Sequence, residues 1–233
     1  RFGVHQRLAL RNKGFGPEGP VINGPAPHQL IMTATPIPRT LAMSAYADLD
    51  CSVIDELPPG RTPVETVVLA NLRRNDIIER VRAACTQGRQ AYWVCTLIEE
   101  SDVLEAQAAE VTASELQLML PGLHIGLIHG RLKPREKLEI MDAFKSGDIN
   151  LLVATTVIEV GVDVPNASLM IIENAERLGL SQLHQLRGRV GRGAYESGCV
   201  LLYRAPLGPL ARARLNAIRD TNDGFTIAER DLE

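Results

Sequence analysis

From residue 64 onward, two spacings of hydrophobic positions alternate along the chain. Short, almost wholly apolar runs are typical of strands buried on both faces, whereas apolar residues three and four positions apart are typical of helices. The runs predict strands at residues 64–69, 91–97, 124–128, 151–154, 169–173 and 200–203. The helical spacing predicts helices at residues 74–87, 102–120, 133–144, 182–192 and 209–219. This alternation predicts an α/β fold with a parallel sheet that helices cover on both faces.

The first 64 residues follow a different pattern. Residues 29–34 predict another buried strand, which runs into Thr35 and a helix. The glycines and prolines between residues 14 and 27 predict a loop. Three further prolines and a glycine lie between residues 55 and 64. Because adjacent prolines stiffen a linker, we predict a hinge at residues 56–64 that separates two domains.

The stretch from Gln182 to Gly193 carries the most distinctive chemistry. As a continuous helix it would place Gln185, Arg189 and Arg192 on one face, since these residues are spaced i, i+4 and i+7. Guanidinium groups suit phosphate oxygens because their N–H groups form a planar fork. The pattern therefore predicts a phosphate site. The alternative is a surface helix whose arginines pair with neighbouring carboxylates.

Two glycines support the phosphate interpretation. Gly188 and Gly191 would each cost about 1 kcal/mol relative to alanine inside a helix. Close approach of another backbone or of a ligand is the usual reason for accepting that cost. On the opposite side of the predicted helix, Leu183, Leu186 and Val190 form an apolar face that can be buried.

Polar residues also follow two of the predicted strands. His129, Gly130 and Arg131 follow the strand at 124–128, and the segment at 155–163 follows the strand at 151–154. We expect both segments and the arginine helix to converge on one edge of the sheet, where open α/β folds bind ligands. Hydroxyls, a glycine backbone and an arginine suit phosphodiester oxygens. Asp163 suits a ribose hydroxyl or an arginine, whereas a histidine such as His129, taken alone, is more often structural.

Composition narrows the remaining possibilities. The net charge of −3 gives no global attraction to polyanions, so a nucleic-acid site has to be a local patch. The four cysteines lack C-x-x-C spacing, and we expect no metal site; Cys95 and Cys199 lie in apolar runs and are predicted to be buried. A Walker G-x-x-x-x-G-K-[ST] motif is absent, as are a signal peptide and a membrane-spanning apolar run. We therefore expect a cytoplasmic protein that handles phosphates without a complete nucleotide site; the family resemblance given next implies that it is nucleoid-associated.

These segments resemble the ordered motifs of superfamily 2 helicases. Residues 185–192 resemble motif VI, 154–163 motif V, 91–100 motif IV and 33–35 motif III. Longer segments, at 33–49, 52–63, 173–193 and 215–233, resemble the RecG family of bacterial ATP-dependent DNA branch-migration helicases. The resemblance covers nearly the whole chain except the loop at 14–27.

The resemblance implies a RecA-like fold of the P-loop NTPase type. Residues 1–55 would be the end of the first motor domain, 56–64 the hinge, 65–220 the second motor domain, and 221–233 the start of a translocation hairpin. The Walker lysine, the Asp-Glu-x-His box and a wedge domain would lie upstream of Arg1. ATP and Mg²⁺ would bind mainly to the absent first domain, so we expect the chain alone to be inactive. The DNA partners would be forks and Holliday junctions in recombination and in repair of stalled replication forks.

The same resemblance implies roles for individual residues. Arg192 would be an arginine finger with Arg189 beside it at the phosphates. The remaining assignments are to the nucleotide side (Gln185, Gly161, Asp163), to the DNA backbone (His129, Gly130, Arg131, Thr155, Thr156) and to coupling between the two (Thr33, Thr35).

Two alternatives remain at this point. Another superfamily 2 translocase, of the transcription-coupled repair type or an RNA helicase, would use the same fold and the same phosphate chemistry. A RecA-like module that only binds a partner would leave the predicted glycine cost without a purpose.

Overall fold

A computed structural model describes residues 61, 63–96, 102–155, 164–193 and 195–231, with a few isolated positions before residue 61. The chain divides into two compact units, residues 1–33 and 34–233. In the first unit, β1 (Phe15–Gly16) pairs antiparallel with β2 (Gly19–Pro20) inside the predicted loop. Of the predicted buried strand at 29–34, the structure describes only Leu30 and Met32, which are outside any strand and 83% exposed, so the prediction is wrong at these two positions. Most of the predicted hinge at 56–64 lies outside the described residues.

In the described residues, the second unit is built on six strands, all parallel. In sequence they are β3 (Glu65–Ala70), β4 (Gln90–Val94), β5 (Ile125–Ile128), β6 (Leu151–Ala154), β7 (Ala167–Ile172) and β8 (Gly198–Tyr203). Their spatial order is β3-β8-β7-β4-β6-β5, and each neighbouring pair is parallel. The predicted parallel sheet is confirmed, and every predicted strand after residue 64 is present within a few residues of its expected bounds.

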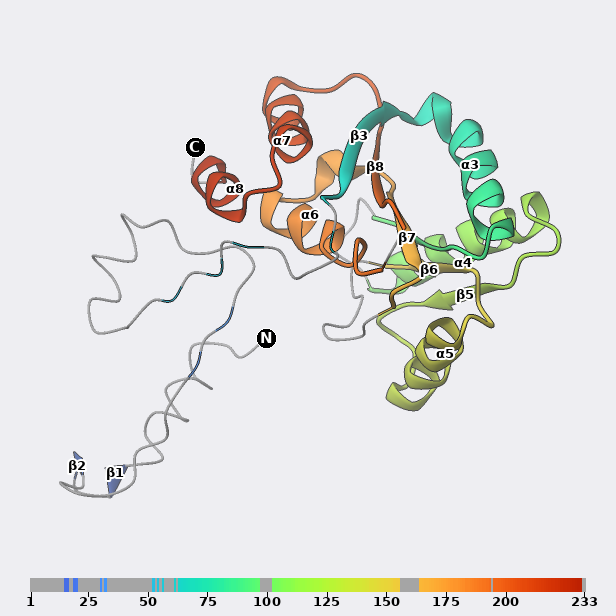
Figure 1. Cartoon of the computed structure of the whole chain (residues 1–233), viewed down its shortest axis with the longest axis horizontal. Helices are drawn as coiled ribbons and strands as arrows, with labels where there is room; N and C mark the ends of the chain where they lie inside the picture. Colours follow the sequence, from blue (N-terminus) through green and yellow to red (C-terminus); the bar gives the residue numbers. More distant parts are fainter. Residues whose placement is uncertain are drawn as a thin grey trace. The chain divides into compact units, whose positions relative to one another are not determined.

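Helices cover both faces of this sheet, as the alternation predicted (Figure 1). The helices are α3 (Arg74–Thr86), α4 (Asp102–Met119), α5 (Pro134–Ser146), α6 (Leu180–Arg187), α7 (Pro209–Asp220) and α8 (Gly224–Arg230), with 3₁₀ turns η2 (Asn71–Arg73) and η3 (Ala175–Arg177). Buried side chains of α3 and α4 pack on one face, and those of α5 to α8 pack on the other.

The strands are buried on both sides because their side chains alternate between two cores. In β4, Tyr92 and Val94 join the core under α5 to α8, whereas Ala91 and Trp93 join the core under α3 and α4. Tyr92 meets Phe144 of α5 edge to face, with ring centroids 4.9 Å apart. Such pairs add about 0.5–1.5 kcal/mol beyond their buried area. The continuous apolar runs in the sequence are the consequence of this two-sided burial.

Helix ends follow local chemistry that the sequence displays. Gly88 and Gly147, which follow α3 and α5, have φ of +82° and +93°, values that glycine adopts without a Cβ penalty. Pro134 occupies the first turn of α5. Leu215 and Ile218 of α7 are buried, whereas Leu210 in its first turn is 69% exposed. It lies eight residues before buried Ile218, and at about 100° per residue it points roughly 80° away from it.

Three cysteines are buried in these cores, as was expected for Cys95 and Cys199. Burial raises the pKa of Cys85 to about 11 and those of Cys95 and Cys199 to about 12. A folded-state pKa above the unfolded value of about 8.5 means that these thiols favour the folded state below that pH. Their contribution to the stability of the folded state is lost as the pH rises toward the folded-state pKa values.

We therefore expect the three thiols to resist iodoacetamide at pH 8 in the folded protein and to react in urea. Because the thiolate is the reactive species, a raised pKa and burial slow the reaction together. Peptide mapping by mass spectrometry measures the labelling site by site. Rapid stoichiometric labelling of any of the three before unfolding contradicts the packing described above.

Candidate functional site

Helix α6 is shorter than the sequence indicated. It begins at Leu180 and ends at Arg187, and Gly188 is its C-cap residue. Arg189 and Arg192 therefore lie in the loop that follows, not on the helix, and the prediction of one continuous helical face through Gln185, Arg189 and Arg192 is wrong. We call residues 188–193 the arginine loop.

The glycines of the arginine loop do not lie in the interior of a helix, where their missing side chains would let a ligand approach. Gly188 has φ of −67°, an ordinary helical value, whereas Gly191 has φ of +79°, in the left-handed region that glycine favours. At Gly193, a Cβ would lie 2.1 Å from the carbonyl oxygen of Pro165. Close approach of another backbone was the right reason for a glycine in this stretch. It applies at Gly193, whereas a Cβ at Gly188 would meet its nearest backbone atom at an ordinary 3.5 Å.

Arg187 anchors the start of the arginine loop. Its side chain is buried, and Nη1 lies 2.5 Å from the carbonyl oxygen of Ile218 and 2.9 Å from that of Thr221. The same nitrogen lies 3.5 Å from Thr66 Oγ1, at the beginning of β3. Burial lowers the pKa of Arg187. The sequence pattern was not used to assign Arg187 a role. An arginine within the apolar positions of a helix nevertheless indicates a buried, hydrogen-bonded side chain.

Arg189 and Arg192 have a different environment. Arg189 is partly buried, and its side chain makes no hydrogen bond or ion pair with any residue that the structure describes. Burial lowers its pKa, and the positive charge of Arg192 lowers it further. Arg192 is exposed, and its Nε lies 3.4 Å from the carbonyl oxygen of Gly188. The two guanidinium groups thus repel each other, an arrangement that a bound polyanion stabilises.

The arginine loop lies at the amino edge of the sheet. Arg61, just before β3, donates to the Gly188 carbonyl at 3.4 Å, and Gly193 contacts Pro165, just before β7. His129 and Thr155 follow the carboxyl ends of β5 and β6. The prediction that all three segments converge on one edge is therefore wrong. In a βαβ unit the helix runs antiparallel to the strands, so a loop after the helix emerges at the opposite edge.

The residues at the carboxyl edge differ in exposure. Thr155 is only 2% exposed and His129 only 8%, whereas Gly130 and Arg131 are exposed. His129 Nε2 lies 3.7 Å from Glu110 Oε1, and its buried Nδ1 has no hydrogen-bond partner among the described residues. Arg131 forms no ion pair within the described part of the chain. Gly130 and Arg131 are the members of this group that a ligand in solvent can reach.

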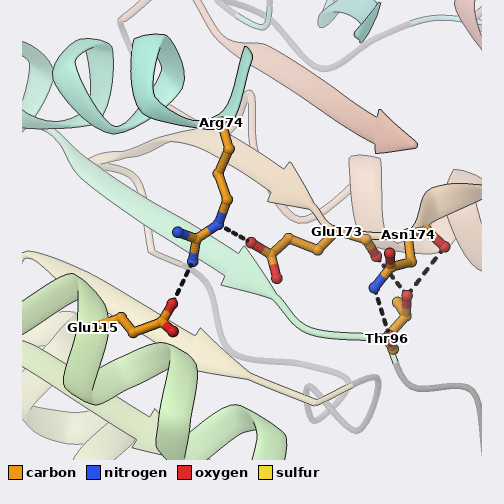
Figure 2. A network of polar contacts seen from close by, with 5 residues as sticks. All are labelled: Arg74, Thr96, Glu115, Glu173 and Asn174. Carbon is orange, nitrogen blue, oxygen red and sulfur yellow. Dashed lines mark hydrogen bonds and ion pairs between the residues drawn. The ribbon is translucent and has the colours of Figure 1, made fainter. Parts of the chain in front are cut away.

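A polar network at the same edge was missed by the sequence analysis (Figure 2). Glu173 and Asn174 follow β7, and Thr96 follows β4. The hydroxyl of Thr96 donates a hydrogen bond to the carbonyl oxygen of Glu173. Asn174 has φ of +48° and donates from Nδ2 to the Thr96 carbonyl oxygen at 3.1 Å. On the other side, Arg74 Nε lies 2.6 Å from Glu173 Oε1. An asparagine directly after a buried strand is the one local signal, since asparagine tolerates the left-handed region.

Several predicted site residues lie outside the described residues. These are Thr33, Thr35, Thr156, Gly161 and Asp163. The described residues that flank the last three lie at opposite edges of the sheet, Thr155 at the carboxyl edge and Val164 at the amino edge. Gln185 is partly buried on α6 and has interactions within the chain.

Metal-ligand clusters and membrane-spanning helices can be considered for the residues that the structure describes. In that part of the chain, no three histidine, cysteine or acidic side chains come together as metal ligands. Similarly, none of the described helices combines the length and apolarity that a membrane crossing needs.

The two kinds of arginine lead to different expectations. Replacing Arg187 with methionine should lower the free energy of unfolding by about 2–4 kcal/mol, because buried carbonyl groups lose a charged donor. Replacing Arg189 with methionine should change it by less than about 1 kcal/mol, since no hydrogen bond is lost. Urea unfolding followed by circular dichroism measures both. Equal destabilisation by the two changes contradicts the anchor role of Arg187.

Comparison with known proteins fits this geometry. A family model described as the helicase conserved C-terminal domain matches residues 73–194, more than half of the chain. The ATP-dependent DNA helicase RecG of Escherichia coli (strain K12) is 71% identical over 234 residues, which cover 100% of this chain and 33% of the relative. RecG of Bacillus subtilis (strain 168) is 47% identical, again over 100% of this chain and 33% of the relative. The chain thus spans about a third of the length of these relatives.

Among solved structures, one of RecG bound to a three-way DNA junction is similar at a TM-score of 0.76 and 45% sequence identity. The match covers 91% of this chain and 28% of that chain. The parallel sheet with helices on both faces is thus the RecA-like fold that the sequence predicted. Along its whole length the chain is similar to RecG, and it belongs to the helicase conserved C-terminal domain family.

Proposed function

We propose that this chain supplies the second motor domain of an ATP-dependent DNA helicase that unwinds and branch-migrates forked DNA and Holliday junctions. The similarity to RecG supports this assignment, and we assign phosphate binding to two separate arginine-bearing surfaces, one at each edge of the sheet. Residues 1–55 would complete a first motor domain, residues 56–64 the hinge and residues 221–233 the start of a translocation hairpin. The upstream part of the full-length protein would hold ATP and Mg²⁺.

The amino edge is the nucleotide side of this proposal. The observation that supports it best is Arg189, a partly buried guanidinium without an acidic partner in the described residues and next to a second positive charge. A nucleotide triphosphate held by the first domain would present its phosphate oxygens to both arginines when the domains close. Arg192, which is exposed, would reach the transferring phosphate, and Arg189 would bind beside it. Gln185, Gly161 and Asp163 would complete this side.

The carboxyl edge is the DNA side. Exposed Arg131 and the Gly130 backbone would contact phosphodiester oxygens and carry no base specificity. His129 and Thr155 are buried in the described conformation, so their proposed contribution to backbone binding runs through the placement of Gly130 and Arg131. Thr156 would contact the same strand. Thr33 and Thr35 would couple DNA binding to nucleotide turnover, and opening and closing at the hinge would move the second domain along DNA.

The nucleotide assignment is tested with Arg192→Ala in the full-length protein. We expect ATP turnover on forked DNA to fall by about 10³- to 10⁵-fold, because an arginine finger stabilises charge that develops in the transition state. ATP binding, measured with a fluorescent nucleotide, should change by only about threefold or less. Arg135→Ala is the matched control, since Arg135 is an exposed arginine on α5 paired with Glu139. Turnover by Arg192→Ala within about tenfold of the unchanged protein refutes the assignment.

The DNA assignment is tested with Arg131→Ala. Loss of one phosphate contact should weaken forked-DNA binding to a similar extent for all sequences, and reduce the slope of log affinity against log salt by about 1. Fluorescence anisotropy at several salt concentrations measures both quantities, again with Arg135→Ala as the control. An unchanged salt slope contradicts a phosphate contact, and tighter binding to RNA than to forked DNA contradicts the proposed substrate.

A further inference from the structure

Helix α6 connects the two edges of the sheet. It starts after η3, which follows the carboxyl end of β7, and it ends at Arg187, which is bonded to Thr66 at the amino end of β3. Its inward side chains, Leu180, Leu183 and Leu186, are buried in the core. Close-packed interiors deform little, so a displacement at the start of α6 is passed to the arginine loop at its end.

The path into α6 is set by Asn174. This residue holds φ of +48° and ψ of +44°, and it turns the chain from β7 into η3. Its side-chain amide donates to the Thr96 carbonyl oxygen, while Thr96 Oγ1 bonds back to the Glu173 carbonyl and lies 3.1 Å from that of Asn174. The two residues therefore hold each other through both side chains and both backbones, as Figure 2 shows. We call this pair the latch.

Glu173 is held separately, from the other face of the sheet. Arg74 bonds to its carboxylate, reaches Glu115 of α4 at 3.4 Å, and places its guanidinium over the Trp93 ring at 5.3 Å from the centroid. The Glu173 backbone N–H also donates to the Val94 carbonyl oxygen at 2.9 Å. Removal of the Thr96 hydroxyl therefore leaves the carboxyl end of β7 attached by contacts that do not involve the latch.

Thr96 also adjoins the proposed DNA side. The strand order places β4 between β7 and β6, and the Cys95 N–H donates to the Ala154 carbonyl oxygen at 2.8 Å. Thr155, the residue after Ala154, donates in turn to the Ile128 carbonyl oxygen, one residue before His129. Backbone hydrogen bonds thus link the carboxyl edge from Ile128, two residues before Gly130, to Cys95, the residue before Thr96.

From this placement we propose that Thr96 and Asn174 are positioning residues that transmit DNA binding at the carboxyl edge to the arginine loop at the amino edge. This inference rests on the proposed function, since it needs DNA at one edge and nucleotide at the other. DNA that engages the edge moves the ends of β5, β6 and β4 together. The latch passes that movement to Asn174, and α6 carries it to Arg189 and Arg192.

The test is Thr96→Val in the full-length protein, which keeps the side-chain shape and removes the hydroxyl. Stimulation of ATP turnover by saturating forked DNA should fall about tenfold, within the usual range of coupling between sites. Turnover without DNA, the KM for ATP and the affinity for DNA should each stay within about twofold. Thr96→Ser restores the hydroxyl and should restore stimulation. Thr86→Val is the control, because Thr86 also bonds a backbone carbonyl, at 3.0 Å, but at the end of α3.

A second variant, Asn174→Gly, keeps the left-handed backbone accessible and removes the amide donor, so it should reproduce the loss of stimulation. Stimulation by Thr96→Val within about twofold of the unchanged protein overturns the proposal. A loss of DNA affinity with full stimulation at saturation also overturns it, because Thr96 would then be a DNA contact. The variant Arg192→Ala distinguishes failure of the proposed function from failure of the coupling proposal. It retains ATP turnover only if the nucleotide assignment itself is wrong.

Discussion

The buried guanidinium of Arg187 is the interaction on which the arrangement of this domain depends. It brings together the end of α6, the last turn of α7 and the start of β3, and its donors satisfy carbonyl groups that would otherwise be buried without partners. An unpaired charge in such a place would be strongly destabilising, so the geometry around it has little freedom. Cys199 lies close by, but burial keeps its pKa at about 12 and hence keeps the thiol neutral. The positive charge is therefore held by backbone dipoles, and the arginine loop begins from a fixed point.

The position of this anchor explains why Arg189 and Arg192, which follow within five residues, have environments so different from that of Arg187. Arg187 points inward, where Nη1 meets the carbonyl oxygens of Ile218 and Thr221 and Nη2 lies 3.1 Å from His184 Nδ1. Arg189 comes after the C-cap residue Gly188, and Gly191, with its left-handed φ, turns the chain out of the helical path. Arg189 and Arg192 then lie close enough for each charge to affect the other, and no described carboxylate separates them. Their mutual repulsion is acceptable in the absence of ligand because Arg192 is exposed to solvent, and it favours binding of an anion.

Much of this fold could be predicted from the sequence, whereas the site could be predicted only in part. The six strands and their parallel direction follow from continuous apolar runs that alternate with helices. The clearest of these runs is β4, which is buried on both faces. The arginine loop was mistaken for helix because Leu186 and Val190 keep helical spacing beyond the point where the helix ends; the left-handed φ of Gly191 leaves no mark in a hydrophobic pattern. The Arg74–Glu173 ion pair joins residues 99 positions apart, and such a contact depends on strand order, which spacing along the chain does not specify.

The separation of the two arginine-bearing surfaces follows from strand polarity. All six strands run in one direction, so residues after a strand and residues after a returning helix cannot share an edge. A protein that binds phosphates at both edges needs a physical connection between them, and in this chain the sheet itself is a poor candidate because its hydrogen bonds run across the strands. Helix α6 crosses from edge to edge, is packed along its length and is bonded at both ends, through Asn174 before its start and Arg187 at its end. In the proposed function, the residues that fix its two ends are therefore as important for coupling as the arginines assigned to the phosphates.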